Sequence, residues 1–261
     1  MIRIGVTGAN GRMGQAVIAA LKDLDESHGL RLAGAHLRSD GAPAVADDVT
    51  VSRDLPTMLA GVDVVIDFTL PSLTSELAAG CRDAGVALVC GTTGLGEAQM
   101  AALRELSKTQ PVFYARNMSV GVNLLLDLVA RASKALGVDY DAEIVEAHHR
   151  HKQDAPSGTA LAIGEAVASA RGQVLKEVID HGREGRTGER EPGRIGMHAL
   201  RAGEIVGEHD LRLVGGGEEL RLGHSAFSRR AFADGALRAA AWVSGQSPGF
   251  YGYPDMLGNA D

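Results

Sequence analysis

A glycine-rich turn near the amino terminus constrains the fold of this chain more than any other feature. Residues 2–6 form a continuous β-type run and residues 13–21 have a helical pattern. Gly8 and Gly11 lie between the two, and Gly14 lies at the start of the helix. Such glycines permit a tight bend and close approach of a pyrophosphate, which the amides of the helix start then stabilise. The spacing G-x-x-G-x-x-G is not the usual dinucleotide fingerprint, so a turn that needs only positive φ angles is the alternative.

Short apolar runs alternate with helical patterns through the first half of the chain. Strands separated by helices of about 10–15 residues predict βαβ units and a parallel sheet, and continuous apolar strands indicate burial on both faces. We therefore predict an α/β fold. The expected strands cover residues 2–6, 30–37, 62–68, 86–90 and 111–114, and the expected helices cover 13–21, 73–82 and 96–107.

The pattern changes after Asn117 and predicts a second, α+β domain. A charged, glycine-rich loop without apolar anchors covers residues 181–193, and Gly215–Gly217 reads as a hairpin turn. We expect domains at 1–119 with 229–261, and at 120–228. Within them we expect a strand at 142–147, three antiparallel strands at 195–201, 204–213 and 218–227, and helices at 121–136, 156–170 (with Pro156 in its first turn) and 229–243.

Composition restricts the partners and the compartment. The chain of 261 residues carries a net charge of −7, and such an acidic balance disfavours duplex DNA and anionic membranes as partners. Its two cysteines suit a reducing compartment. The chain contains no run of 18 apolar residues, and its amino terminus runs into the first strand without the long apolar region of a signal peptide. We therefore expect a cytoplasmic protein without nucleic-acid or membrane partners.

Three further segments follow expected strands, where an open α/β sheet binds its ligands. Arg38 ends the second strand, where an arginine can pair with the 2′-phosphate of NADP; a solvated surface arginine is the alternative. Gly91–Gly94 and Ala115–Met118 offer hydroxyl, amide and backbone groups for the nicotinamide ribose and carboxamide, although ordinary turns are equally compatible with either segment alone. Arg12, in the first turn, can reinforce phosphate binding or simply face solvent.

A histidine-rich segment carries the strongest chemical signal. His148, His149 and His151 fall within four residues, beside Arg150 and Lys152. Crowded cations disfavour further protonation, so histidine pKa values here are tunable toward neutrality, where a histidine acts as general acid or base. Three histidines also raise the alternative of a zinc site, but no cysteine or spaced H-E-x-x-H accompanies them, and we predict no metal.

A predicted helix start follows directly. Ser157, Gly158 and Thr159 lie where free backbone amides favour an anion such as a carboxylate. A proton-transfer group therefore lies close in sequence to an anion site.

Over nearly its whole length, the chain resembles the dihydrodipicolinate reductase family of lysine and diaminopimelate biosynthesis. The resemblance implies a Rossmann-like domain built from both chain ends, and a central domain that binds substrate and forms a homotetramer. It also implies NADH or NADPH as hydride donor to a small cyclic dicarboxylate, 4-hydroxy-tetrahydrodipicolinate. The matching segments are residues 8–14, 67–71, 91–93, 119–123, 143–160 and 201–209.

The resemblance also implies roles for individual residues. His148 matches the proton donor or acceptor of the family, and Lys152 matches its proton donor. His149 together with Ser157, Gly158 and Thr159 matches the site for the substrate carboxylate. The matches to cofactor contacts are Gly8, Ala9, Asn10, Gly11, Arg12, Met13, Gly91, Thr92, Thr93, Ala115, Arg116, Asn117 and Met118.

The chain departs from the family pattern in two places. Arg38 stands where some members carry a ribose-binding glutamate, with Ser39 in place of a following arginine, and residues 116–118 differ from the usual versions. Because a guanidinium can make two charge-assisted bonds to a 2′-phosphate, Arg38 predicts a preference for NADPH with NADH still usable, and Asp40 opposes it if it points inward.

Two other functions are compatible with these residues. One is an aspartate- or homoserine-type dehydrogenase of similar split architecture. The other is a dinucleotide sensor that binds NADPH without turnover. The His148–Lys152 segment followed by Ser157–Thr159, which suits a dicarboxylate, favours the reductase.

Overall fold

The computed structural model describes residues 1–38, 41 and 43–258. Contacts divide the chain into two units, Met1–Val120 with Arg229–Asp261, and Gly121–Ser228. The first division falls one residue after the boundary expected from the sequence, and the return falls at residue 229. Within the described residues, every helix is too short or too polar to cross a membrane.

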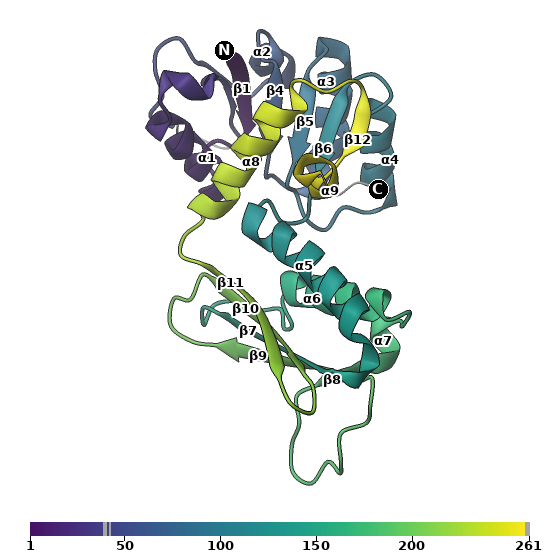
Figure 1. The fold of residues 1–261 in the computed structure, drawn as a ribbon. Helices are drawn as coiled ribbons and strands as arrows, with labels where there is room; N and C mark the ends of the chain where they lie inside the picture. Colours follow the sequence, from purple (N-terminus) through teal and green to yellow (C-terminus); the bar gives the residue numbers. More distant parts are fainter. Residues whose placement is uncertain (39–40, 42, 259–261) are drawn as a thin grey trace. The chain divides into compact units, whose positions relative to one another are not determined.

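The first unit contains a seven-stranded parallel sheet (Figure 1). Its order is β12-β6-β5-β4-β1-β2-β3, and every pairing is parallel. This confirms the expected Rossmann-like fold. The strands are β1 (Ile2–Thr7), β2 (Leu30–His36), β3 (Thr50–Ser52), β4 (Val64–Asp67), β5 (Ala87–Cys90), β6 (Pro111–Tyr114) and β12 (Gly249–Tyr251).

Helices cover both faces of this sheet, as the continuous apolar strands require. One buried cluster joins the sheet to α1 (Arg12–Asp23), α8 (Arg230–Val243) and α9 (Tyr253–Leu257). A second cluster joins its other face to α2 (Leu55–Leu59), α3 (Pro71–Ala84) and α4 (Glu97–Leu106). A short 3₁₀ helix covers Glu26–His28. The C-terminal segment thus completes the domain that the N-terminal segment begins.

The second unit contains a five-stranded mixed sheet in the order β11-β10-β7-β9-β8. β10 pairs antiparallel with β7 and β11, whereas β9 pairs parallel with β7 and β8. The prediction that residues 195–201 are antiparallel is therefore wrong, because a helical crossover between β7 and β9 returns the chain in the same direction. The strands are β7 (Asp141–His148), β8 (Ile179–His181), β9 (Ile195–Arg201), β10 (Gly207–Val214) and β11 (Glu219–Ala226).

Three helices accompany this sheet: α5 (Val120–Leu136), α6 (Gly158–Ala170) and α7 (Leu175–Val178), with a 3₁₀ turn at Gly137–Asp139. α5 and α6 bury their apolar stripes against one sheet face. α6 begins at Gly158, because the Ser157 side chain caps it by accepting the N–H of Ala160 at 3.2 Å. Pro156 therefore precedes the helix, and its expected place in the first turn is wrong.

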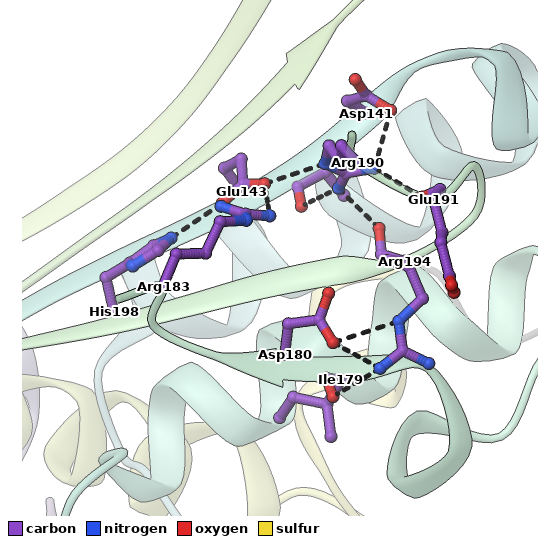
Figure 2. Close-up of polar contacts among 10 residues, drawn as sticks. Asp141, Glu143, Ile179, Asp180, Arg183, Arg190, Glu191, Arg194 and His198 are labelled. Carbon is purple, nitrogen blue, oxygen red and sulfur yellow. Dashed lines mark hydrogen bonds and ion pairs between the residues drawn. The ribbon is translucent and has the colours of Figure 1, made fainter. Parts of the chain in front are cut away.

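Arginines hold the charged loop after β8 against the sheet, although it has no apolar anchors (Figure 2). Arg183 and Arg190 both donate to Glu143 on β7. Arg194 pairs with Asp180. A Cβ atom at Gly196, which pairs with Glu143 across the strands, would lie only 1.9 Å from the Glu143 carboxylate. The absence of a side chain at Gly196 therefore leaves room for this ion cluster.

Candidate active site

The glycine-rich turn joins β1 closely to α1. Gly8 has a φ of +61°, and the N–H of Gly11 donates to the Gly8 carbonyl at 2.8 Å. A Cβ atom at Gly14 would lie 2.2 Å from that carbonyl oxygen, so only glycine permits this packing. α1 begins without a side-chain cap. Its first amides are thus available to a phosphate, and the turn fits the pyrophosphate of a dinucleotide.

A cavity of about 680 Å³ lies beside this turn. Gly8, Asn10, Gly11 and Arg38 line it, so the structure brings four of the expected cofactor residues together. His36, the last residue of β2, lines it as well and was not predicted. Ser39 and Asp40 lie outside the described residues.

Several expected cofactor residues have side chains buried in the core. Ala9 and Met118 are buried in the cluster under α1 and α8, and Ala115 belongs to the same cluster. The Met118 carbonyl accepts the Tyr253 hydroxyl at 2.6 Å. Their side chains therefore serve packing. Among the remaining expected positions, Arg12, Thr93 and Arg116 are exposed and Met13 and Asn117 are half-buried.

Thr92 takes part in a buried network around Asp67, which ends β4. The Thr92 hydroxyl donates to this carboxylate at 2.7 Å, and the hydroxyls of Thr7 and Thr69 donate at 2.6 Å each. A Cβ atom at Gly91 would lie 2.4 Å from the Phe68 ring. The network joins the ends of β1, β4 and β5 beside the glycine turn. Sequence reasoning gave Asp67 no role, and the available signal was a carboxylate ending an apolar strand.

In the second unit, His148 contacts a carboxylate that sequence reasoning missed. His148 is the last residue of β7, and its Nδ1 lies 2.6 Å from Oε2 of Glu146. The Glu146 side chain is fully buried, whereas that of His148 is 12% exposed. Two residues apart on a strand, both side chains lie on the same face. That spacing was the signal that could have identified Glu146.

Three more hydrogen bonds stabilise the Glu146 carboxylate. Arg201, at the end of β9, donates to both oxygens at 2.8 Å, and the Ser157 N–H donates to Oε1 at 3.0 Å. Burial alone would raise the pKa of Glu146, but the hydrogen bonds from Arg201, His148 and Ser157 outweigh it and lower the pKa. Glu146 is thus ionised at neutral pH, and it connects the histidine to the start of α6.

His209 on β10 completes this cluster. Its Nε2 lies 2.9 Å from Oγ of Ser157, and its ring meets that of His148 edge-to-face with centroids 5.2 Å apart. Burial, together with the nearby charge of His148, lowers the pKa of His209 to about 4. His209 is therefore neutral at physiological pH. His209 lies in the segment 201–209 that matches the family, but the sequence alone assigned it no role.

Lys152 lies in the turn after β7, close to His148. Its N–H donates to the His149 carbonyl at 3.1 Å, and its Nζ lies 2.9 Å from Oδ1 of Asp154. Burial lowers the pKa of His148, the Glu146 contact opposes this, and the charge of Lys152 adds to the lowering. The expected effect of crowded cations is therefore present, but burial is the larger cause.

The remaining expected substrate residues frame the same segment. Gly158 and Thr159 form the first turn of α6 after the Ser157 cap. The rings of His149 and His151 lie with centroids 6.0 Å apart. In the described part of the chain, no group of three or more His, Cys, Asp or Glu side chains is placed to hold a metal ion, so the zinc alternative has no support there.

Comparison with known proteins identifies the family. Residues 2–118 match the family described as dihydrodipicolinate reductase, N-terminus, and residues 121–257 match dihydrodipicolinate reductase, C-terminus. The 4-hydroxy-tetrahydrodipicolinate reductases of Halorhodospira halophila and Alkalilimnicola ehrlichii are 48% and 49% identical, with 98% of both chains covered in each case. A dipicolinate-bound dihydrodipicolinate reductase from Paenisporosarcina sp. TG-14 has the same fold, with a TM-score of 0.80 at 22% identity over 98% of this chain and 99% of that one. This chain belongs to the dihydrodipicolinate reductase family.

Proposed function

We propose that this chain reduces 4-hydroxy-tetrahydrodipicolinate to tetrahydrodipicolinate, in lysine and diaminopimelate biosynthesis. Its family consists of NAD(P)H-dependent oxidoreductases. The observation that carries the proposal is the cluster in which one buried carboxylate, Glu146, contacts both His148 and the start of α6. A proton-transfer group and an anion site are thereby held together, as reduction of a dicarboxylate requires.

NADH or NADPH supplies the hydride when bound. Gly8, Asn10 and Gly11 would hold the pyrophosphate through the turn and the uncapped start of α1. Arg38, at the rim of the same cavity, would pair with a 2′-phosphate. The other proposed contacts are Ala9, Arg12, Met13, Gly91, Thr92, Thr93, Ala115, Arg116, Asn117 and Met118; the buried ones among them would contribute backbone rather than side-chain atoms.

His148 and Lys152 are the proposed catalytic residues. The net reaction consumes one hydride and one proton and releases water, because the 4-hydroxyl group leaves as the ring carbon becomes electrophilic. His148 is proposed to exchange a proton through its imidazole, whose pKa is lowered by burial. Lys152 supplies a positive charge and a proton donor on the same loop.

The proposed substrate site is the start of α6. The amides of Gly158 and Thr159 and the hydroxyl of Ser157 would bind one carboxylate of the substrate, together with His149. Ser157 is well placed for this role, because its backbone N–H and its side chain are both fixed by buried partners.

We also propose that residues 1–119 with 229–261 bind the dinucleotide, and that residues 120–228 bind substrate and form a homotetramer. Large apolar side chains exposed on the second unit support an assembly through that unit. They include Leu200 on β9, Leu220 on β11 and Phe227 directly after β11. Two buried free cysteines and a biosynthetic role support a cytoplasmic location.

An absorbance assay tests the activity. Purified protein is mixed with NADPH or NADH and freshly made 4-hydroxy-tetrahydrodipicolinate, while aspartate and homoserine are tested with NADP⁺ or NAD⁺. We expect rapid oxidation of the reduced cofactor with the cyclic substrate alone. Turnover of aspartate or homoserine instead would favour the other dehydrogenase, and tight NADPH binding with no turnover would favour a sensor.

A further inference from the structure

All acceptor sites of the buried Glu146 carboxylate are filled. Oε1 accepts hydrogen bonds from Arg201 and from the Ser157 N–H, and Oε2 accepts from Arg201 and from His148 Nδ1. A carboxylate offers about four lone-pair sites. Glu146 therefore has no free site to take a proton from a substrate, and the described structure leaves it one role toward catalysis, which is to act through His148.

The same contacts determine which nitrogen of His148 carries a proton. An ionised carboxylate can only accept, so Nδ1 must be the donor in the 2.6 Å contact. In neutral His148 the lone pair then belongs to Nε2. A Cβ atom at Gly207 would lie 3.1 Å from Nε2, so the glycine on β10 leaves space beside that nitrogen.

We propose that Glu146 is a positioning residue, which holds His148 in the Nδ1–H tautomer so that Nε2 alone exchanges the proton of the reaction. Through Ser157 the same carboxylate holds the start of α6 in register with His148. This inference rests on the proposed catalytic role of His148, and it adds a residue and a specific nitrogen atom to that role.

The charges that face His148 determine how its pKa responds when the charge of Glu146 is removed. Among the described residues, Glu146 on β7 is the one anion in contact with it, whereas Lys152 in the following loop and Arg201 on β9 are cations, and neutral His209 packs from β10. Asp154 pairs with Lys152 in that loop. Removing the charge of Glu146 leaves the cations unopposed and disfavours the imidazolium form. The pKa of His148 must then fall.

β7 supplies a matched control, the Glu143 carboxylate (Figure 2). Glu143 also accepts four hydrogen bonds, two from Arg183, one from Arg190 and one from His198 Nε2 at 2.7 Å. The two glutamates therefore share donor types and strand. They differ in that only Glu146 contacts His148.

The experiment measures kcat/KM as a function of pH, from pH 5 to 9, for Glu146→Gln and for Glu143→Gln. The limb of the pH profile that reports the titration of His148 is the one that is abolished in His148→Asn. In Glu146→Gln we expect that limb to move about 1 unit to lower pH, which is the low end of the range for loss of a neighbouring opposite charge. We expect kcat/KM at pH 7.5 to fall about 10²-fold, mainly through kcat.

In Glu143→Gln we expect the limb to stay in place and kcat/KM to change less than about threefold, although thermal stability falls in both variants. If Glu146 served stability alone, the two variants would lose activity in proportion to the folded fraction, with no movement of the limb. That result, or equal shifts in both variants, would overturn the proposal.

A second measurement needs no mutation at Glu146, in case Glu146→Gln fails to fold. ¹⁵N-histidine NMR of the wild-type protein above the pKa of His148, assigned with His148→Asn, reports the tautomer. A proton on Nδ1 supports the proposal and a proton on Nε2 overturns it. If wild-type protein fails to oxidise NAD(P)H with the cyclic substrate, the proposed function is wrong, and the tautomer still decides the Glu146–His148 relationship.

Discussion

The Ser157 hydroxyl and the His209 imidazole meet inside the second unit, where Oγ lies 2.9 Å from Nε2. Both side chains are buried, and the contact joins the start of α6 to β10. Ser157 accepts the Ala160 N–H as well. If His209 donates through Nε2, the Ser157 proton is left to donate to a bound carboxylate; if Ser157 donates instead, that proton is used within the protein. In either arrangement the buried Nδ1 of His209 lacks a partner in the described structure.

Burial of neutral His209 predicts an acid-sensitive fold. An unfolded histidine titrates near 6.5, whereas burial and the nearby charge of His148 lower the pKa of His209 to about 4. Between these values the unfolded state binds more protons, so stability is fully present above pH 6.5 and falls as the pH falls toward 4. At 1.36 kcal/mol per pKa unit the loss is roughly 3 kcal/mol. Urea unfolding at pH 7, 6, 5 and 4 should show a shallower pH dependence in His209→Gln than in wild type; equal slopes would contradict the low pKa.

Substitution of His148 tests its catalytic role. His148→Ala removes the group proposed to exchange a proton, and we expect kcat to fall about 10²- to 10⁴-fold, which is the usual contribution of a positioned acid or base. KM should change little, because the start of α6 remains to bind the substrate carboxylate. Steady-state kinetics with the cyclic substrate measures both constants. Near-wild-type kcat in this variant would remove His148 from the mechanism.

Lys152→Ala should affect both turnover and binding. Loss of the ammonium removes a proton donor and a positive charge facing a doubly anionic substrate, so we expect kcat to fall about 10²- to 10⁴-fold and KM to rise. Gln153→Ala, at the neighbouring exposed position, is the matched control and should leave both constants near their wild-type values. Lys152 would be ruled out as a catalytic group if its substitution left kcat unchanged.

Arg38 should tilt the enzyme toward NADPH while leaving NADH usable. A hydrogen bond to a charged group contributes about 1.5–3 kcal/mol, roughly tenfold to hundredfold in affinity, whereas a bare ribose hydroxyl gains little from a guanidinium. Arg38 is exposed, so solvent screening favours the lower end. The ratio of kcat/KM for NADPH over NADH should therefore fall about tenfold in Arg38→Ala at fixed low salt. A wild type that clearly prefers NADH, or an unchanged ratio in the variant, would refute this role.

The elements of the first unit were predictable because their cause is local. Apolar runs and helical periodicity identified five of the strands and the main helices to within a few residues, and β6 was placed at its observed bounds. The short elements were missed: β3, β8, β12, α2, α7 and α9 each contain three to five residues. Such segments are too short for a periodic pattern, and they form because neighbouring strands and helices supply their partners.

The residues of the candidate site also fall into those that could be predicted from the sequence and those that could not. The segment from His148 to Thr159 could be read from the sequence, because its residues are consecutive and their chemistry is visible in their order. Arg201 and His209 could not be assigned roles, because their relation to Glu146 and Ser157 depends on strand pairing between β7, β9 and β10. Glu146 was missed although its spacing of two residues from His148 on one strand was visible in the sequence. The pairing of His148 with Arg201, and of Glu208 with Ala147, brings these side chains together across more than 50 positions.

The amino-acid sequence by itself determined the family and the fold class, and it was enough to propose the proton-transfer and anion-binding segment, because these depend on local pattern and on motifs of consecutive residues. Tertiary structure alone decided which residues of each motif are buried in the core and which partners their side chains contact. It buried Ala9 and Met118 in the core, made β9 parallel to β7, and brought Ser157 and Arg201, which lie 11 and 55 positions away in the chain, to the Glu146 carboxylate. The physical reason is that a buried charge is stable only when its hydrogen-bond sites are filled, and those partners become available only after the sheet has paired.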